Sequence, residues 1–194
     1  MKLANMGYLT GGYQGKLEVL NDFNEKRKVD ELAEKIRADQ ETLLLSDAGM
    51  PLISDPGFRL VKKIIEMGGE ITSIPGPSAV TTAVCLSGLS ADRVLFLGFL
   101  PKKKSKREKQ WNSIKSFAGL GLTVAIYEPA RSVLKTLEEI KGEFANVEVV
   151  IARELTKKYE EIIRGEVDGL LSRLAEKPIK GEVVLLWRLR KCRK

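Results

Sequence analysis

The stretch "LLLSDAGMPLISDPGF" at residues 43–58 decides how the first half of this chain is expected to fold. An apolar run leads into it, and the pattern "RLVKKIIEMG", which is typical of a helix, follows it. A strand and a helix are usually joined by a few residues, whereas the loop here runs from residue 46 to residue 57 and is rich in Asp, Gly and Pro. Such a loop indicates a binding role, although Asp-Gly and Pro-Gly turns are also ordinary breaks between elements.

The segments around this loop alternate between strand and helix patterns. Apolar positions recur with helical spacing in residues 24–38, and "TLLLS" is a fully apolar run of strand length. Fully apolar strands are typical of a sheet that is covered on both faces. We therefore expect an α/β layer with a buried, largely parallel sheet, with helices at 24–38, 58–68 and 78–88 and strands at 42–46 and 70–76.

The same alternation continues after a plausible hinge near Ala91. The chain is long enough for two small domains, and we expect them at residues 1–92 and 93–194. In the second domain, strands are expected at 94–101, 122–129, 147–156 and 181–189, and helices at 102–117, at 130–142 and within 160–177.

Charge is unevenly distributed along the chain. The net charge is +7, and residues 102–109, "KKKSKREK", carry six Lys and Arg against one Glu. Basic runs of this kind favour anionic partners, nucleic acid first among them, although a solvated basic loop has the same composition. No apolar run reaches the length of a membrane span, and the N-terminus lacks a signal-peptide core, so a cytoplasmic protein is expected.

The absence of histidine excludes imidazole bases and histidine metal ligands. The two cysteines, Cys85 and Cys192, lie far apart in the sequence, so no metal site is expected. Cys85 lies in an apolar helical pattern and is expected to be a buried, reduced thiol. A general base must therefore come from a carboxylate, Lys, Tyr or Cys.

Four predicted strand ends carry unusual polar residues. They are the loop at 46–57, "SIPGPSA" at 73–79, "IYEPAR" at 126–131 and "ARELTKKYEE" at 152–161. In parallel sheets ligands bind where such loops converge, but turn residues, a helix cap and surface ion pairs explain each loop equally well when it is taken alone. The chain has no P-loop and no dinucleotide-binding glycine motif, and spacing alone names no ligand.

Several motifs together resemble a known family. "SDAGMPLISDPGFRLV", "IPGPSA", "DRVLFLGFLPKKKSKR", "YEPAR", "ARELTK" and "KGEVVLL" occur in the order found in the tetrapyrrole methylase-like (class III) methyltransferases, which use S-adenosylmethionine. Within that family the motifs are most similar to members that 2′-O-methylate a cytidine ribose in small-subunit ribosomal RNA. The resemblance implies two α/β subdomains of the tetrapyrrole methylase type, usually in a homodimer, with the cofactor in the cleft between the domains.

The resemblance also implies a set of functional residues. The carboxylates that could assist the ribose hydroxyl are Glu128, Asp55 and Glu154. The cofactor candidates are Asp47, Ala48, Gly49, Pro51, Ser54, Asp55, Ser78, Ala79, Tyr127, Leu155, Thr156 and Gly181, with Glu128 and Glu154 facing the same cleft. The RNA candidates are Lys102, Lys103, Lys104, Lys106, Arg107, Arg131, Arg153 and Lys157.

The chain departs from the family pattern at its beginning. Residues 1–20 contain no equivalent of the family's "TPIGNL"-like loop, so the first domain is expected to lack its usual first strands. A degenerate paralogue, a fragment and one half of a split enzyme all fit this pattern. The alternatives to an active ribosomal RNA methyltransferase are thus a catalytically degenerate or truncated RNA-binding or partner module and a small-molecule (tetrapyrrole) methylase. A sheet without its first strands exposes edges, so self-association is also expected.

Overall fold

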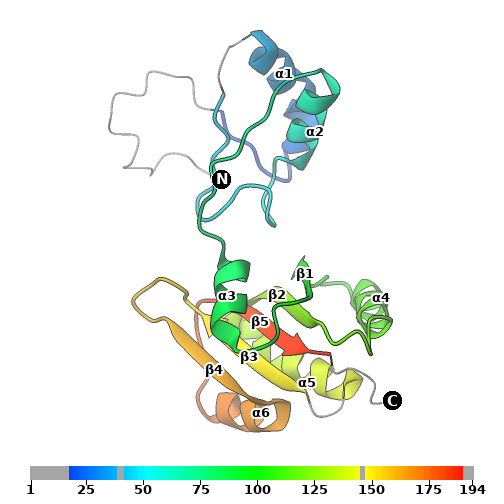
Figure 1. Cartoon of the computed structure of the whole chain (residues 1–194), viewed down its shortest axis with the longest axis vertical. Helices are drawn as coiled ribbons and strands as arrows, with labels where there is room; N and C mark the ends of the chain where they lie inside the picture. Colours follow the sequence, from blue (N-terminus) through cyan, green and yellow to red (C-terminus); the bar gives the residue numbers. More distant parts are fainter. Residues whose placement is uncertain (1–17, 39–41, 145–146, 190–194) are drawn as a thin grey trace. The chain divides into compact units, whose positions relative to one another are not determined.

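The structure is a computed structural model that describes residues 18–38, 42–144 and 147–189 (Figure 1). The chain divides into two compact units, unit 1 (Met1–Pro77) and unit 2 (Ser78–Lys194). The helix α3 (Ala79–Ser87) thus belongs to unit 2, although it precedes the domain boundary expected at residue 92. That boundary stays a prediction, and the two units are described separately.

The described residues of unit 1 form two helices and the loops around them. The helices α1 (Glu25–Ala38) and α2 (Phe58–Glu66) confirm two of the predicted helices. They pack against each other through a small apolar core to which both helices contribute. The buried members of this core are Leu20, Leu32, Ala33, Leu60 and Ile64.

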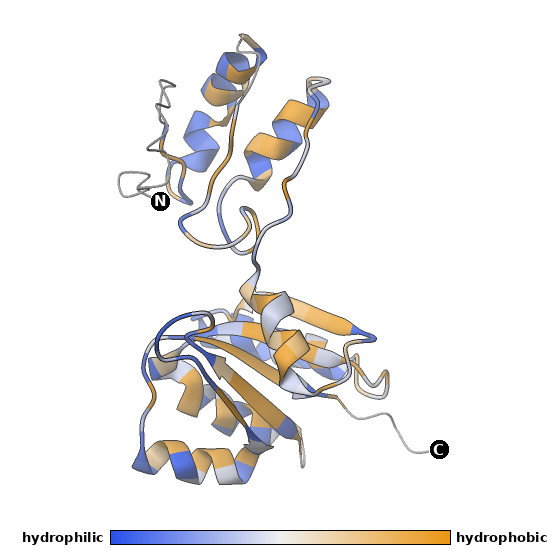
Figure 2. Cartoon of the chain, turned by 60° about the vertical axis from the view of Figure 1, so that its left-hand side comes forward, coloured by the Kyte–Doolittle hydropathy of each residue, from blue (hydrophilic) through white to orange (hydrophobic). Residues whose placement is uncertain are grey.

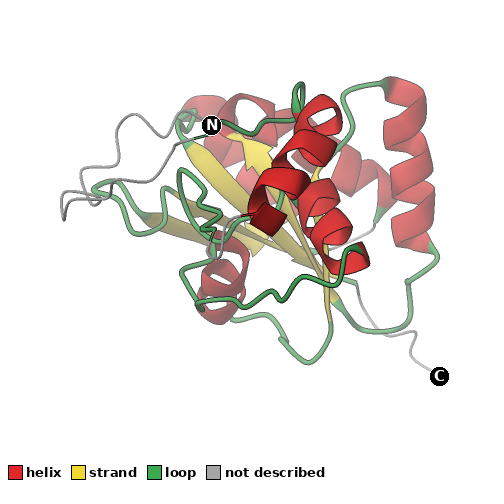
Figure 3. Cartoon of the chain, turned by 90° about the horizontal axis from the view of Figure 1, so that it is seen from above, coloured by secondary structure: helices red, strands yellow, loops and turns green. Residues whose placement is uncertain are grey.

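The expected strands at 42–46 and 70–76 do not form, and all strands in the described residues belong to unit 2 (Figure 3). A strand is stable only when its backbone groups pair with a neighbour, and no described segment of unit 1 supplies that pairing. Each segment consequently exposes apolar surface to solvent, 58% of Leu43 and 79% of Ile74. The prediction of a buried parallel sheet in this half was therefore wrong for the described residues.

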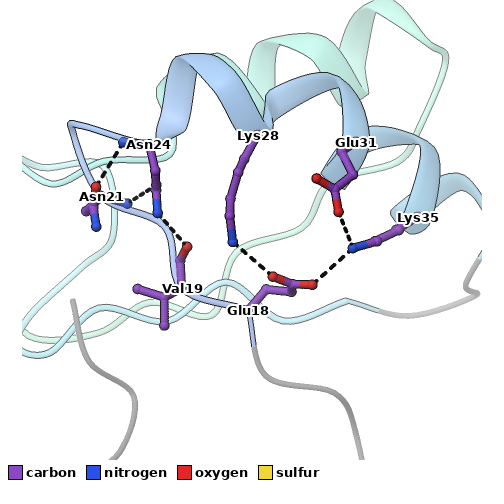
Figure 4. Close-up of polar contacts among 7 residues, drawn as sticks. All are labelled: Glu18, Val19, Asn21, Asn24, Lys28, Glu31 and Lys35. Atoms are coloured by element: carbon purple, nitrogen blue, oxygen red, sulfur yellow. Dashed lines mark hydrogen bonds and ion pairs between the residues drawn. The ribbon is translucent and has the colours of Figure 1, made fainter.

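The start of α1 is fixed by side chains from the segment before it (Figure 4). The Asn24 backbone N–H donates to Asn21 Oδ1 at 2.9 Å, and the Asn21 N–H donates to Asn24 Oδ1 at 2.8 Å. The Glu18 carboxylate bridges Lys28 and Lys35 at 3.1 and 3.0 Å. Asn21 thus pairs the Asn24 N–H, which has no partner inside the helix, and Glu18 ties two lysines of α1 to the segment before it.

The buried carboxylate of Glu25 ties the two helices together. Its Oε1 accepts the backbone N–H groups of Gly57 and Arg59, each at 3.0 Å, and its Oε2 lies 3.4 Å from the Arg59 guanidinium. The side chain of Glu25 is almost completely buried. An anion at the first turn of α2 is favoured by the helix dipole, so Glu25 fixes the point at which the loop 46–57 ends.

Unit 2 is a five-stranded mixed sheet covered by helices on both faces (Figure 1). Strand β1 is parallel to β2, whereas β5 is antiparallel to both β2 and β3. The strands are β1 (Val94–Phe99), β2 (Thr123–Pro129), β3 (Glu148–Arg153), β4 (Glu161–Glu166) and β5 (Glu182–Arg188), in the spatial order β1-β2-β5-β3-β4.

The helix α3 packs on one face of this sheet, which we call the α3 face. The other face is covered by α4 (Lys104–Lys115), α5 (Val133–Glu143) and α6 (Val167–Glu176), with a short 3-10 turn, η2 (Ala130–Ser132), before α5. Apolar residues line the strands, and charged residues gather in the connecting loops (Figure 2). The predicted strands and helices of this half are confirmed in position, with boundaries that differ by a few residues.

The helix α4 begins at Lys104, so most of the basic run is helical, as the sequence predicts. Two other details of unit 2 differ from the sequence-based expectation. Strand β4 was not predicted, because its charged residues were assigned to the helical pattern that follows. Cys85 is exposed, since α3 buries Val80 and Ala83 against the sheet and turns Cys85 to the outside. None of the helices in the described residues has the length and apolar character needed to cross a membrane.

We predict that Glu25→Ala destabilises unit 1 by about 2–4 kcal/mol, because two backbone N–H groups lose a charged acceptor. Amide hydrogen exchange should become faster at Gly57 and Arg59 first. The matched control is Glu31→Ala, which removes only an exposed ion pair with Lys35 and should leave stability nearly unchanged. Equal exchange in the two variants would contradict the structural role of Glu25.

Candidate functional site

The strand directions of unit 2 bring several predicted loops to one edge of the sheet. Because β5 and β4 run against β3, the carboxyl ends of β1, β2 and β3 share an edge with the amino ends of β4 and β5. We call this the carboxyl edge. Candidate residues from three distant parts of the sequence lie along it, namely Tyr127 to Arg131, Arg153 to Lys157, and Gly181.

Glu154 is the centre of a polar network at this edge. Its Oε1 accepts the backbone N–H of Glu182 at 2.9 Å, and its own N–H donates to the Glu182 carbonyl at 2.9 Å. Lys157 Nζ lies 3.3 Å from Glu154 and 2.8 Å from the Glu182 carboxylate. The bond from the Glu182 N–H, aided by Lys157, lowers the pKa of Glu154, so this carboxylate is ionised and a weak base at neutral pH.

Several residues at this edge also have positive φ values. Glu154 and Thr156 have φ values of 48° and 63°, in the left-handed region that costs energy for residues with a side chain. Gly181 has a φ of 96°, and a Cβ added there would lie only 2.7 Å from Glu154 Cγ. The glycine therefore lets the β5 loop approach the Glu154 side chain. Beside it is a cavity of about 250 Å³ lined by Pro129, Ala130, Arg131, Ile179, Lys180 and Gly181.

Tyr127 and Glu128 are neighbours in sequence but lie on opposite faces of the sheet. Tyr127 packs on the α3 face, whereas Glu128 follows the buried Val124 and Ile126 onto the face covered by α4 and α5. Only 4% of Glu128 is exposed. Burial raises the pKa of its carboxyl group, although Arg107 and a hydrogen bond from Thr136 oppose the rise. This placement sets Glu128 apart from the Glu154 network.

The basic run divides into an anchor and an exposed part. Arg107 is only 11% exposed at its side chain, and it binds Glu139 at 2.6 Å and the Thr136 hydroxyl at 2.7 Å. Trp111 Nε1 donates to the same Glu139 carboxylate at 3.1 Å, so these contacts hold α4 against α5. Arg107 is therefore bound within unit 2. Among the RNA candidates in this run, the side chains left to solvent are those of Lys102, Lys103, Lys104 and Lys106.

The remaining basic candidates, Arg153, Lys157 and Arg131, also differ in their contacts. Arg153 lies 2.9 Å from Glu161, which also binds Arg173, and its Nε donates to the Lys180 carbonyl. Lys157 instead joins the Glu154 network. The two therefore do not share one set of contacts, although both lie near the carboxyl edge. Arg131 is exposed in η2.

In unit 1 the first part of the loop 46–57 is held by hydrogen bonds around Gly49. The Ser46 hydroxyl donates to the Ala48 and Gly49 carbonyls at 3.2 and 2.6 Å. Gly49 has a φ of 75°, and a Cβ there would lie 3.4 Å from the Pro77 carbonyl, so the loop lies beside the "IPGP" turn. The structure thus brings together two candidate segments that are separate in sequence.

The acidic side chains of this loop influence one another. Partial burial, followed by the nearby carboxylates of Asp47 and Asp22, raises the pKa of Asp55. Asp47 itself is exposed, together with Ala48, Gly49 and Ser54, while Pro51 is half-buried. Asp55 is therefore a better proton acceptor than an ordinary aspartate when it is ionised.

The other cofactor candidates belong to α3 and β3. Ser78 is the N-cap residue of α3, but its hydroxyl forms no capping bond, and its carbonyl accepts the Thr81 and Thr82 hydroxyls. Ala79 begins the helix and is exposed. Leu155 packs against the apolar residues of the α3 face. Among the described residues, no cluster of acidic or thiol side chains could hold a metal ion.

The family model for Tetrapyrrole (Corrin/Porphyrin) Methylases matches residues 11–171 of the chain. The chain belongs to the tetrapyrrole methylase family. Proteins named ribosomal RNA small subunit methyltransferase I, from Pasteurella multocida and Thermotoga maritima, are 42% and 36% identical to it. Each match covers 86% of this chain, with 59% of the Pasteurella protein and 73% of the Thermotoga protein. The chain thus spans less than two thirds of the Pasteurella relative.

Solved tetrapyrrole methyltransferases share the fold. The methyltransferase CobJ matches with a TM-score of 0.64 at 17% identity, covering 88% of this chain and 73% of CobJ. Uroporphyrin-III C-methyltransferase from Thermus thermophilus, complexed with S-adenosylhomocysteine, matches with a TM-score of 0.57 at 11% identity, covering 84% of this chain and 73% of that protein. At these identities the likeness establishes the α/β fold of the family.

Sequence reasoning missed two residues that shape these loops. Glu25 lies in a predicted helix and was not singled out there, and only the structure shows its carboxylate at the start of α2. Glu139, in another predicted helix, holds Arg107 and Trp111. An acidic residue on the apolar side of an amphipathic helix is the signal that could have indicated both.

We predict that Gly181→Ala destabilises unit 2 by about 2 kcal/mol and displaces Glu154, because alanine is strained at this φ and its Cβ meets that side chain. The control is Gly142→Ala within α5, where a Cβ meets nothing within 4 Å and should stabilise the helix by about 1 kcal/mol. Urea unfolding followed by tryptophan fluorescence measures both, and a neutral Gly181→Ala would contradict the close approach.

We also predict that Glu128→Gln raises the stability of unit 2 at pH 7. A carboxyl group whose folded pKa is raised costs stability as pH rises above its ordinary value of 4.5, and glutamine carries no charge to bury. The gain should therefore shrink as pH falls below that value. Glu138→Gln, at an exposed position of α5, is the control and should show no such dependence. A gain that is independent of pH would rule out charge burial as the cause.

Proposed function

We propose that this chain acts as an S-adenosylmethionine-dependent methyltransferase that 2′-O-methylates a cytidine ribose in small-subunit ribosomal RNA. The observation that carries the proposal is the convergence of the Glu154, Gly181 and Arg131 loops at the carboxyl edge. The relatives at 36–42% identity, which are named ribosomal RNA small subunit methyltransferase I, supply the reaction and the RNA class. Cytoplasmic rRNA processing follows from that substrate.

The residues present fit the cofactor. In unit 1, the exposed backbone at Gly49 permits close approach, and the nearby Asp47 carboxylate suits ribose hydroxyls or a positive charge. In unit 2, Tyr127 and Leu155 offer apolar surface, and Thr156 and Gly181 offer backbone groups in left-handed conformations. When bound, S-adenosylmethionine supplies an activated methyl group next to a positively charged sulfonium.

The tasks left to the chain are to orient the ribose, to exclude water and to accept the hydroxyl proton. Three carboxylates were expected as candidate bases, and their surroundings differ. Glu128 is buried beneath α4 and α5, and Glu154 is held by the Glu182 N–H and Lys157, which lowers its pKa. Asp55 has a raised pKa and lies in the candidate loop, so we propose Asp55 as the base and Glu154 as an orienting group.

For the RNA, we propose that the exposed Lys102, Lys103, Lys104 and Lys106 contact phosphates and that Arg107 supports them by anchoring α4. Lys157, Arg131 and Arg153 are further candidates near the carboxyl edge. We also propose that the protein forms a homodimer, because apolar side chains of unit 1 such as Leu43 and Ile74 remain exposed.

One observation favours a second function, that of a non-catalytic RNA-binding or partner module. The segments 42–46 and 70–76, which precede and follow the candidate loop and α2, form no strands in the described residues. A loop without a rigid sheet beneath it positions a cofactor poorly. A tetrapyrrole methylase is a weaker alternative, since it rests on the shared fold alone.

The decisive assay uses the purified chain, labelled S-adenosylmethionine and unmethylated small ribosomal subunits. We predict transfer of label to a ribose 2′-oxygen, located by nuclease digestion and mass spectrometry. Asp55→Asn should reduce the transfer rate by about 100-fold or more, as expected for loss of a general base. Glu154→Gln should reduce it less, and Glu128→Gln should leave it nearly unchanged.

Binding of S-adenosylhomocysteine separates the two functions. If the folded wild type binds RNA but neither binds S-adenosylhomocysteine nor transfers label, the chain is a binding module. If Asp55→Asn, Glu154→Gln and Glu128→Gln all retain full transfer, no carboxylate of this set is the base.

A further inference from the structure

Strand β1 contains an irregularity that changes the face on which its last residue lies. Leu95 and Leu97 pack toward α4–α6, and Phe96 packs on the α3 face. Regular alternation would place Phe99 with the two leucines. The register instead pairs Phe96 with Ala125 and Phe99 with Tyr127, so three steps along β1 match two along β2. Gly98, with a φ of 62°, accommodates the extra residue.

As a result, Phe99 joins an aromatic cluster on the α3 face. The ring of Tyr127 lies 4.9 Å from that of Phe96 and 5.5 Å from that of Phe99, measured between ring centroids. Phe96 and Tyr127 are half-buried, whereas 58% of Phe99 is exposed. The bulge thus takes a phenylalanine from the helix-covered side and presents its ring to solvent at the carboxyl edge, beside a ring that supports it.

The residues that follow Phe99 are cationic. Leu100 is buried and fixes the chain, and Lys102, Lys103 and Lys104 come directly afterwards with exposed side chains. The Arg107 anchor to Glu139 holds the helix that carries Lys104 and Lys106. An exposed aromatic ring next to a positively charged segment is the arrangement by which proteins bind single-stranded nucleic acid, since bases stack on the ring and phosphates meet the cations.

We propose that Phe99, supported by Tyr127, is a stacking platform for an unpaired base of the RNA substrate, and that Lys102–Lys104 hold the phosphates of the same strand. This inference rests on the proposed function and adds to it a positioning residue and a substrate form. A duplex hides its base faces, so the substrate must present at least one unstacked nucleotide. An apolar protein partner fits the site less well, because three exposed lysines adjoin the ring.

The test uses Phe99→Trp, which keeps an aromatic ring and turns it into a fluorophore. The natural tryptophans, Trp111 and Trp187, are 3% and 0% exposed, so they report little of what binds at the surface. Titration with a short single-stranded RNA should quench the emission of the variant. An abasic strand of equal length and charge should bind the lysines without quenching, and S-adenosylhomocysteine alone should also leave the emission unchanged.

Affinity gives an independent readout. We expect Phe99→Leu to weaken binding of single-stranded RNA about 10-fold, as loss of one stacked base does, and Phe99→Tyr to retain it. Val94→Ala, at the other end of β1 with 41% of the side chain exposed, is the matched control and should bind as the wild type does. Circular dichroism of each variant verifies that the fold is kept.

The possible failures are distinguishable. If the wild type binds neither RNA nor small subunits, the proposed function fails and the stacking role fails with it. If the wild type binds RNA but Phe99→Trp is not quenched, or if Phe99→Leu binds as tightly as the wild type, only the stacking role is overturned. Quenching by S-adenosylhomocysteine alone would assign the ring to the cofactor and overturn the inference.

Discussion

The two-sided pairing of β5 is the constraint on which the arrangement of unit 2 depends. This strand is antiparallel to β2 on one side and to β3 on the other, and its residues from Val183 to Trp187 are almost completely buried. Trp187 packs against the rings of Trp111 and Phe144, at 5.8 and 6.4 Å between centroids. The strand directions follow from this pairing, and with them the meeting of the Glu154, Gly181 and Arg131 loops at the carboxyl edge.

Much of unit 2 could be predicted from sequence because its signals are local. Apolar runs of strand length and helical periodicity identified four of the five strands and all of the helices. Strand β4 was missed because its stability comes from pairing with β3, which its own charged sequence does not reveal. The mixed strand directions and the bulge before Phe99 also depend on neighbouring strands, so no local pattern announces them.

In the candidate site, too, some features follow from local sequence and others depend on how the strands pair. Motif order placed Glu154 and Gly181 in one group, and the structure brings them into contact. Motif order also grouped Tyr127 with Glu128, whereas the alternation of a β-strand separates their side chains. Arg107 was grouped with the exposed lysines but is committed to Glu139. Sequence proximity thus identified the right loops, while strand geometry and burial decide which side chains are available.

Unit 1 shows that strand propensity alone does not produce a strand. Its two helices form as expected because α1 and α2 cover each other's apolar faces. "TLLLS" and "EITSIPG" have strand composition but require a partner backbone, which the described residues of this unit do not supply. The loop 46–57 keeps its internal bonds nevertheless, through Ser46 and the Glu25 cap. The loop that carries the family motif is therefore held by these bonds, although no strand forms beside it in the described residues.

Calorimetric titration of the folded wild-type protein measures directly whether this chain binds S-adenosylmethionine. We expect saturable binding of S-adenosylmethionine and of S-adenosylhomocysteine, in competition with each other. Absence of any binding heat from protein whose circular dichroism and tryptophan emission show an intact fold would contradict it.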